Sequence, residues 1–301
     1  MNEVGIIGGI TADIEGHPYT KLIYGDSNPG KISMSYGGVG RNITENLARM
    51  GVSVSFVSVA GDDFAGRGAV RELSDLGVDV KNVRLLPEEN TAVYLSILNL
   101  IGDMELGLCN MDVLERVSAD VIDSVYESLK TCRIIGLDTN MTEETLDYAT
   151  RKFKDIPLFL DPVSAAKAER ARKIIGRFHT VKPNRMEAEV ISGMSILNAD
   201  ELERAAAWFI DQGVRRVFIT LGPGGVYYTD GRESGLMRPN PSEIVSATGA
   251  GDAFSAAVIY SHLNGFDIRK AAETGMAAAA AAMRSKTAVN PEMSEALLLQ
   301  P

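Results

Sequence analysis

The order in which apolar and amphipathic segments follow one another constrains the fold of this chain more than any other feature. Short apolar runs, which predict buried strands, alternate with longer segments of helical periodicity. We expect strands at residues 4–9, 53–60, 133–138, 157–161, 178–182 and 216–221, and helices at 41–50, 63–76, 119–130, 143–153, 165–175, 185–192, 200–212 and through most of 248–284. This alternation is typical of a parallel sheet covered by helices. The sequence therefore predicts an α/β fold with a doubly wound, mostly parallel sheet in an αβα sandwich.

Two segments interrupt the alternation. Residues 15–36 are polar, contain Gly, Pro and Asn, and exceed the roughly 2–6 residues of an ordinary strand-to-helix connection. Residues 91–109 contain two strand-like runs on either side of Gly102-Asp103, a pair typical of a hairpin turn. We expect both segments to form a small β lid outside the main sheet. The chain has 301 residues, which leaves room for two domains, but one domain over residues 1–301 with these lid insertions accounts for the length.

Charge and cysteine content argue against several classes of protein. The chain has 40 Asp and Glu against 30 Lys and Arg, a net charge of −10. A groove for polymeric nucleic acid and a contact with an anionic membrane both need a Lys/Arg excess, so neither partner is expected. Cys109 and Cys132 form no CxxC pair, and the three histidines form no HExxH motif. We expect a cytoplasmic protein without a disulfide framework or a histidine-based metal site.

The most informative segment for function is SATGAGDAF at residues 246–254. Its glycines precede a predicted helix at 253–263, and glycines at a helix start leave backbone N–H groups open to an anion such as a phosphate. Asp252 lies among these donors. It could cap the helix, or it could be a general base that accepts the proton of an attacking hydroxyl group. The local pattern leaves both interpretations open.

Two further clusters also permit a structural and a functional interpretation. GGVGRN at 37–42 is either a tight strand-to-helix turn or a surface for a polyol, with the Asn42 amide bonded to its hydroxyls. KPNRMEAE at 182–189 could begin a helix with a capping box formed by Asn184 and Glu187, or these side chains could position magnesium, directly or through water. There is no GxxxxGK[ST] P-loop, and GAGDAF is a weak match to a dinucleotide-binding fingerprint.

Four segments in this order resemble the ribokinase-like (PfkB) family of carbohydrate kinases: GGxGxN near residue 40, KPNxxEAE at 182–189, TLGxxG at 220–225 and GAGDAF near residue 250. The resemblance covers nearly the whole chain. It implies in-line transfer of the γ-phosphoryl group of ATP, with Mg²⁺, to a hydroxyl group of a sugar or nucleoside. DSNPGKI at 26–32 and HTVKPNR at 179–185 are most similar to members that phosphorylate the 5′-hydroxyl of pseudouridine.

The resemblance also implies roles for individual residues. Asp252 would be the catalytic base, and the amides of Gly249, Ala250 and Gly251 would form the anion hole for the transferred phosphoryl group. The substrate-binding candidates are Asp13, Gly38, Asn42 and Asn140. The candidates for binding ATP are Lys167, Asn184, Thr220, Gly222, Gly225 and Thr248, and those for Mg²⁺ are Asn184 and Glu187, through water if not directly. Lys167 follows the Asp161-Pro162-Val163-Ser164 turn, where relatives carry a phosphate-binding arginine; a solvated helix lysine is the other interpretation.

The last expectations concern base recognition by the lid, activation by K⁺ and the oligomeric state. Polar lid residues are expected to form hydrogen bonds with the edge of a uracil base, and the candidates are Ser27, Asn28, Thr91 and Tyr94. Ser246 stands where potassium-activated relatives carry an acidic residue, which puts activation by K⁺ in doubt. The apolar run at 91–100 suits a β-contact, so we expect a homodimer through the lid. The alternatives are a kinase for another sugar or nucleoside, such as ribose or a purine nucleoside, a non-catalytic ligand-binding relative and, more distantly, a nicotinamide oxidoreductase.

Overall fold

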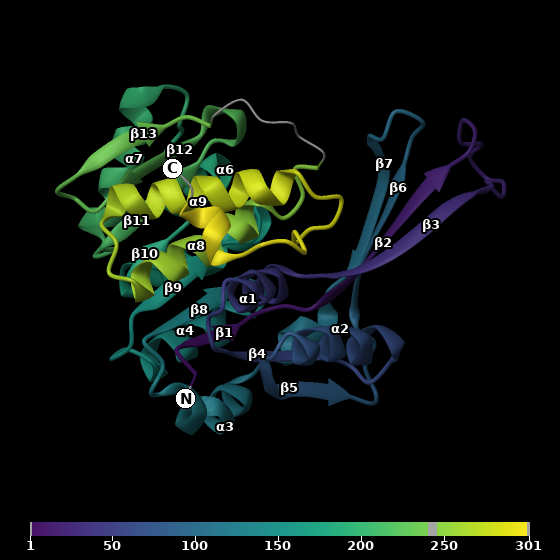
Figure 1. Cartoon of the computed structure of the whole chain (residues 1–301), viewed down its shortest axis with the longest axis horizontal. Helices are drawn as coiled ribbons and strands as arrows, with labels where there is room; N and C mark the ends of the chain where they lie inside the picture. The colour runs from purple at the N-terminus through teal and green to yellow at the C-terminus, as the bar shows by residue number, and fades with distance from the viewer. Residues whose placement is uncertain (1, 240–245, 300–301) are drawn as a thin grey trace.

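The central element of the computed structural model, which describes residues 2–239 and 246–299, is a nine-stranded sheet (Figure 1). Its order is β13-β12-β11-β10-β9-β8-β1-β4-β5. The strands are β1 (Val4–Ile7), β4 (Val54–Gly61), β5 (Asp79–Leu86), β8 (Ile134–Asp138), β9 (Leu158–Asp161), β10 (Thr180–Val181), β11 (Arg216–Thr220), β12 (Val226–Thr229) and β13 (Ser234–Met237). All neighbours from β11 to β5 are parallel, whereas β12 and β13 add an antiparallel edge. The predicted doubly wound, mostly parallel sheet is confirmed.

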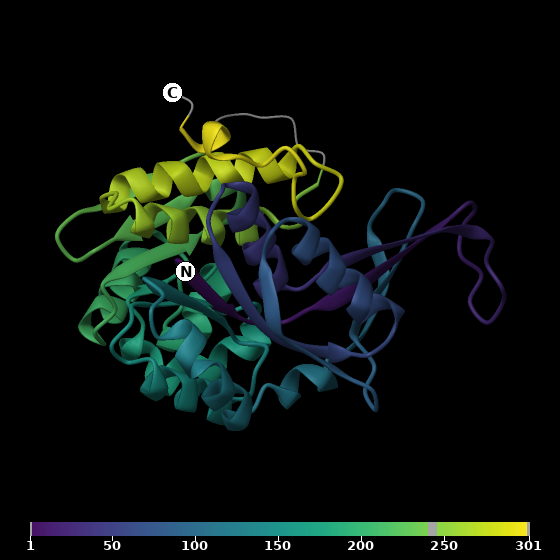
Figure 2. The same ribbon diagram turned by 60° about the horizontal axis from the view of Figure 1, so that its bottom comes forward.

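Helices cover both faces of this sheet, and each face has its own hydrophobic core (Figures 1 and 2). Successive strand residues point to opposite faces, so Ile6 belongs to one core and its neighbour Ile7 to the other. The Ile6 core is covered by α1 (Val39–Arg49), α2 (Phe64–Asp75), α8 (Ala250–Leu263), α9 (Ile268–Met283) and α10 (Glu295–Leu298). The Ile7 core is covered by α3 (Ala119–Leu129), α4 (Glu143–Lys152), α5 (Ala165–Ala168), α6 (Arg185–Ser192), α7 (Ala199–Asp211) and two 3₁₀ helices, Asp112–Arg116 and Glu169–Arg177.

The lid is a second, four-stranded sheet that projects from one side of the sandwich in both views (Figures 1 and 2). Its strands are β2 (Thr11–Pro18), β3 (Gly30–Gly37), β6 (Ala92–Leu98) and β7 (Met104–Asn110), in the order β3-β2-β6-β7. The first lid segment starts at Thr11 rather than at residue 15, because β2 follows β1 after only a short turn. The turn between β6 and β7 contains the predicted Gly102-Asp103 pair.

The structure corrects some of the predicted elements. Residues 165–175 are not one α-helix but α5 followed by a 3₁₀ helix, since the buried Ala171 and Ile174 fit a three-residue period as well. The sequence did not predict β5, β12 or β13; β5 is only partly buried along its length and has no continuous apolar run. Helix α8 begins at Ala250, not at residue 253. No helix among the described residues is both long and apolar enough to cross a membrane.

Candidate active site

The candidate site lies at the edge of the main sheet where the central parallel strands end. Asp138 and Asp161 are the last residues of β8 and β9 and stand in register, and Lys182 directly follows β10. Parallel strands bring their carboxyl ends to one edge, and α1 and α8 begin there too, beside Asp138 and Lys182 respectively. Three charged side chains that are far apart in the sequence are therefore buried together at this edge.

Asp252 lies in the first turn of α8 but does not cap it. Gly249 is the N-cap, with φ 79°, and a side chain at this position would collide with the carbonyl oxygen of Ala288. Asp252 is the third residue of the helix, and its Oδ2 accepts a hydrogen bond from Nδ2 of Asn42 at 2.8 Å. The interpretation of Asp252 as a cap is wrong, because its carboxylate faces α1 instead of the helix's own amides.

The surroundings of Asp252 raise its pKa. Burial is the main cause and the Asp161 carboxylate the second, and together they raise the pKa of Asp252 to about 7. The Asn42 hydrogen bond and the Lys182 ammonium act in the opposite direction. The Nζ atom of Lys182 lies 2.9 Å from Oδ2 of Asp161 and 3.4 Å from the carbonyl oxygen of Gly251. A carboxylate with this pKa exchanges its proton near neutral pH, which suits a general base for a hydroxyl group.

The start of α8 offers an anion both backbone donors and positive charge. Gly249 has no side chain to accept from the amides of the first turn, so the Gly251 amide is open to a ligand. The Ala250 amide donates to the Ala247 carbonyl at 3.5 Å, the limit of a hydrogen bond. A Cβ atom on Gly251 would lie 3.3 Å from Nζ of Lys182, so a buried ammonium stands directly beside the same turn. Sequence reasoning gave Lys182 no role. The available signal was a charged residue at the end of a predicted buried strand.

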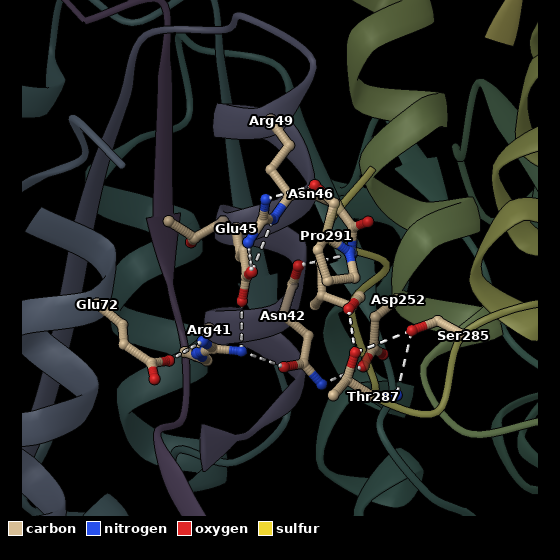
Figure 3. Close-up of polar contacts among 12 residues, drawn as sticks. Arg41, Asn42, Glu45, Asn46, Arg49, Glu72, Asp252, Ser285, Thr287 and Pro291 are labelled. Atoms are coloured by element: carbon tan, nitrogen blue, oxygen red, sulfur yellow. Dashed lines mark hydrogen bonds and ion pairs between the residues drawn. The ribbon is translucent and has the colours of Figure 1, made fainter. Parts of the chain in front are cut away.

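Asp13 lies against Gly37, the residue before Gly38, at the base of the lid. Oδ1 of Asp13, on β2, accepts from Oγ1 of Thr11 at 2.8 Å. Burial raises the pKa of Asp13, while the Thr11 hydrogen bond and the charge of Arg41 oppose the shift. Gly38 is the N-cap of α1 with φ 100°, and a Cβ there would collide with the carbonyl oxygen of Gly9. The glycine cluster is therefore a tight turn, and it brings Asn42 to Asp252 (Figure 3).

Asp138 joins the end of β1 to the start of α1. Its buried carboxylate accepts from the amides of Gly9 and Gly40 and from Nδ2 of Asn140, each at 2.9 Å. Burial raises the pKa of Asp138, and these hydrogen bonds oppose the shift. Oδ1 of Asn140 accepts from Nζ of Lys167 at 2.5 Å. Among the described contacts, Lys167 thus joins a predicted substrate residue and not the predicted nucleotide segment.

The predicted nucleotide segment adjoins the same edge. Thr220 ends β11 and forms a bridge with Asn184, and a 3₁₀ turn at Gly222–Gly224 follows. The turn closes with a hydrogen bond from the Leu221 amide to the Gly225 carbonyl at 2.8 Å. Thr248 directly precedes Gly249, and its amide donates to Oγ of Ser246 at 3.2 Å. Thr220 therefore lies beside the N-cap of α6, and Thr248 lies beside the N-cap of α8.

Asn184 and Glu187 form the capping box of α6. Oδ1 of Asn184 accepts from the Glu187 amide at 2.9 Å, and the two Glu187 oxygens accept from the Asn184 amide and from Nδ2. Burial raises the pKa of Glu187 to about 7, and Lys182 opposes the shift. Within residues 2–239 and 246–299 no three His, Cys, Asp or Glu side chains are grouped as metal ligands. The pair fits a Mg²⁺ ion that is held chiefly by phosphates and water, because both carboxylate oxygens are already hydrogen-bonded within the protein.

Residues 1–295 match the pfkB family of carbohydrate kinases. The chain belongs to this family. The pseudouridine kinase of Escherichia coli K12 is 35% identical over 292 residues, which cover 97% of this chain and 93% of that protein. The crystal structure of a putative sugar kinase from Clostridium perfringens has a TM-score of 0.88 at 32% identity and covers 99% of this chain and 95% of its own. The Arabidopsis thaliana ribokinase, solved with ribose and ATP, has a TM-score of 0.85 at 21% identity and covers 100% of both chains, so the fold is ribokinase-like. The protein is an ATP-dependent sugar or nucleoside kinase of the pfkB family.

The four lid candidates of this pfkB-family chain lie in different places. Tyr94 stands opposite Asp13 in the β2–β6 register, so both side chains are on the same face of the lid. Thr91 is buried, and its Oγ1 donates to Oδ1 of Asp63 at 2.7 Å, which takes it away from that face. Asn28 accepts from the Ile23 amide at 2.8 Å and so closes the exposed β2–β3 loop, where Ser27 also lies. The sequence could not tell which of these candidates lie on the Asp13 face, because loop contacts and strand register determine their positions.

Proposed function

We propose that the protein transfers the γ-phosphoryl group of ATP to the 5′-hydroxyl of pseudouridine and releases pseudouridine 5′-phosphate and ADP. The observation that carries the chemistry is Asp252, a carboxylate with a pKa raised to about 7 beside the open first turn of α8. The similarity to the Escherichia coli pseudouridine kinase over almost the whole chain supports the choice of substrate. A non-catalytic relative would have no need of a titratable base at an anion-binding helix start.

In this proposal Asp252 accepts the proton of the 5′-hydroxyl while that oxygen attacks the γ-phosphorus and the bond to the β–γ bridging oxygen breaks. The Gly251 amide donates to the oxygens of the transferred group, and Lys182 offsets part of its charge. Thr220, Gly222, Gly225 and Thr248 hold the nucleotide. Asn184 and Glu187 hold Mg²⁺ through water, and the bound ion supplies charge neutralisation on the phosphates.

The polar face of the lid is the proposed cover for the nucleoside. Asp13 accepts from the ribose hydroxyls, and Asn42 on α1 and Asn140, just after β8, border the same space. Two cross-strand rows lie on the Asp13 face, Ser35-Asp13-Tyr94-Cys109 and Ser33-Glu15-Ser96-Gly107. Their hydroxyl and carboxylate groups suit a substrate rich in hydroxyls and imide N–H groups, and the closed lid excludes water from the reacting phosphate.

The opposite face of the lid is apolar, which supports the proposal of a homodimer. Its rows are Met34-Ile14-Leu95-Leu108 and Ile32-Gly16-Ile97-Leu106. Ile32 is 75% exposed and Leu108 is 67% exposed. A contiguous apolar surface of this size is rarely left in contact with water by a monomeric protein. A second copy of the same face would cover these rows. Leu108→Glu is expected to lower the mass measured by sedimentation to that of one chain, and an unchanged dimer would refute the proposed interface.

The free cysteines Cys109 and Cys132 support a further proposal, a cytoplasmic location, since exposed Cys109 persists as a thiol in a reducing compartment.

Substrate specificity is tested by ADP release with a panel of acceptors. Pseudouridine, uridine, guanosine, inosine and ribose are each supplied with ATP and Mg²⁺, and kcat/KM is compared. Pseudouridine is expected to give the highest value. Uridine is the matched control, because it differs only in the bond that joins base to ribose. A higher kcat/KM for ribose or a purine nucleoside would overturn the substrate proposal and leave the kinase assignment standing.

A further inference from the structure

Arg41 is a buried arginine one residue away from the partner of the proposed base. Its NH1 group lies 3.2 Å from Oδ1 of Asn42 and 2.6 Å from Oε2 of Glu45 (Figure 3). Its NH2 group lies 3.0 Å from Oε2 of Glu72, on α2. The guanidinium therefore ties α1 to α2 and also contacts the side chain that bonds to Asp252.

We propose that Arg41 is a positioning residue that fixes the orientation of the Asn42 amide and thereby favours the ionised form of Asp252. The inference rests on the proposed function, in which Asp252 is the base. A guanidinium only donates hydrogen bonds, so the atom that Asn42 turns toward Arg41 must be its oxygen. The Nδ2 group is then on the other side of the amide, where it donates to Oδ2 of Asp252. A rotated amide would bring two acceptor oxygens together.

The other partners of Arg41 explain why an arginine is needed. Glu45 is buried and is shared between Arg41 and Arg49, whereas the side chain of Glu72 is 55% exposed and lines a surface cavity of about 570 Å³ beside α2. Three acceptors therefore surround one guanidinium at fixed positions. A lysine keeps the positive charge but has a compact ammonium without the planar fork, and it cannot satisfy all three acceptors in this geometry.

The charges that face Asp252 from the other elements come from Asp161 on β9, Asp138 on β8 and Lys182 after β10, and Glu187 on α6 adjoins Lys182. Asn42 is the contribution of α1. Substituting Arg41 leaves each of these groups in the protein. A change in the titration of Asp252 in an Arg41 variant therefore reports the loss of the Asn42 hydrogen bond, which is the step that the proposal invokes.

The experiment compares Arg41→Lys and the pair Arg41→Gln/Glu45→Gln with Arg49→Gln as the matched control. Arg49→Gln also removes an ion pair of Glu45, at 2.7 Å, but leaves the Arg41–Asn42 contact in place. The Gln/Gln pair removes both partners, so it leaves no Glu45 carboxylate buried opposite a missing charge. The Asp252 carboxyl is titrated by ¹³C NMR, with Asp252→Asn for assignment, and kcat is measured against pH.

Arg41→Lys is expected to raise the pKa of Asp252 by about one unit and to move the acidic limb of kcat by the same amount, with kcat recovering at high pH. Asn42→Ala should give a similar shift, and combining it with Arg41→Lys should add nothing, because both act through one hydrogen bond. Arg49→Gln should lower Tm without moving the pKa. Unchanged titration in both Arg41 variants, with a loss of Tm equal to that of Arg49→Gln, would overturn the proposal.

The titration needs no substrate, so the two proposals fail in different ways. An absence of turnover by the wild-type protein with every acceptor would refute the proposed function, yet the shift of the Asp252 signal would still support the role of Arg41. Normal turnover with an unshifted Asp252 in the Arg41 variants would refute the positioning role alone.

Discussion

Replacing Asp252 by Asn separates the proposed catalytic role of this residue from its place in the fold. The asparagine side chain has nearly the same shape, and its Oδ1 can still accept from Nδ2 of Asn42, so the start of α8 keeps its contact with α1. The amide cannot accept a hydroxyl proton. General-base assistance is typically worth roughly 10²–10⁴-fold, so kcat is expected to fall by that factor, while the Kd for ATP changes by no more than a few-fold.

The same variant is expected to be more stable than the wild type at neutral and higher pH. Burial first, and Asp161 second, raise the pKa of Asp252 from 3.8 to about 7, so the folded protein holds a proton that the unfolded chain releases. Below about pH 4 the carboxyl group is protonated in both states and contributes no penalty. As the pH rises toward 7, the loss of stability caused by ionising the buried carboxyl group grows, and above about pH 7 this loss is complete. The shift corresponds to at most about 4 kcal/mol in the free energy of unfolding.

Three measurements check this prediction: kcat by ADP release, ATP affinity by calorimetry, and Tm at about pH 8 and about pH 4. Asp200→Asn is the matched control, because Asp200 is an exposed carboxylate in the first turn of α7. Losing it should cost about 0.3–1 kcal/mol through the helix dipole and leave kcat unchanged. An Asp252→Asn variant that retains most of its kcat would refute the catalytic assignment. A Tm below that of the wild type at pH 8 would refute the electrostatic reasoning.

Three further predictions concern Lys182, the lid loop and the monovalent cation. Lys182→Gln removes the cation between Asp161 and Asp252, so the acidic limb of kcat should move to higher pH; a limb at the wild-type pH would contradict the assigned role. Asn28→Ala should raise KM for the nucleoside but not for ATP, because the loop that Asn28 closes belongs to the lid, and equal KM values would remove the loop from the substrate site. Replacing K⁺ by Na⁺ in the assay should leave kcat within about two-fold, since Ser246 carries no charge to bind a cation; a larger loss of kcat would contradict this.

The sequence predicted those parts of the fold that depend on local pattern. The buried strand β8 appears as a continuous apolar run, β4 appears through its alternation of apolar residues with serine, and the lid hairpin appears through Gly102-Asp103. The edge strands β5 and β13 could not be predicted in this way, because their side chains are partly exposed and their sequences lack a run of apolar residues. Pairing with a neighbouring strand, and not local composition, determines them.

The same distinction holds for the site. Gly249 and Asp252 were identified because one short motif contains both the helix start and the carboxylate. Asp138 was not identified, since it joins β1 to α1 through amides that lie 129 and 98 residues earlier in the chain. The contact of Lys167 with Asn140 likewise follows from the meeting of α5 with the end of β8. Side chains whose partners come from distant strands become visible only when the sheet is assembled.

The most direct test of the proposed function is to determine which oxygen receives the phosphoryl group. Wild-type protein is incubated with ATP, Mg²⁺ and pseudouridine, and the product is identified by ³¹P NMR with phosphorus–proton coupling. We expect a phosphomonoester on the 5′-oxygen of pseudouridine in stoichiometric amount with ADP, and almost none from Asp252→Asn over the same time. Phosphorylation at another hydroxyl, or equal product from the Asp252→Asn protein, would contradict the proposed function.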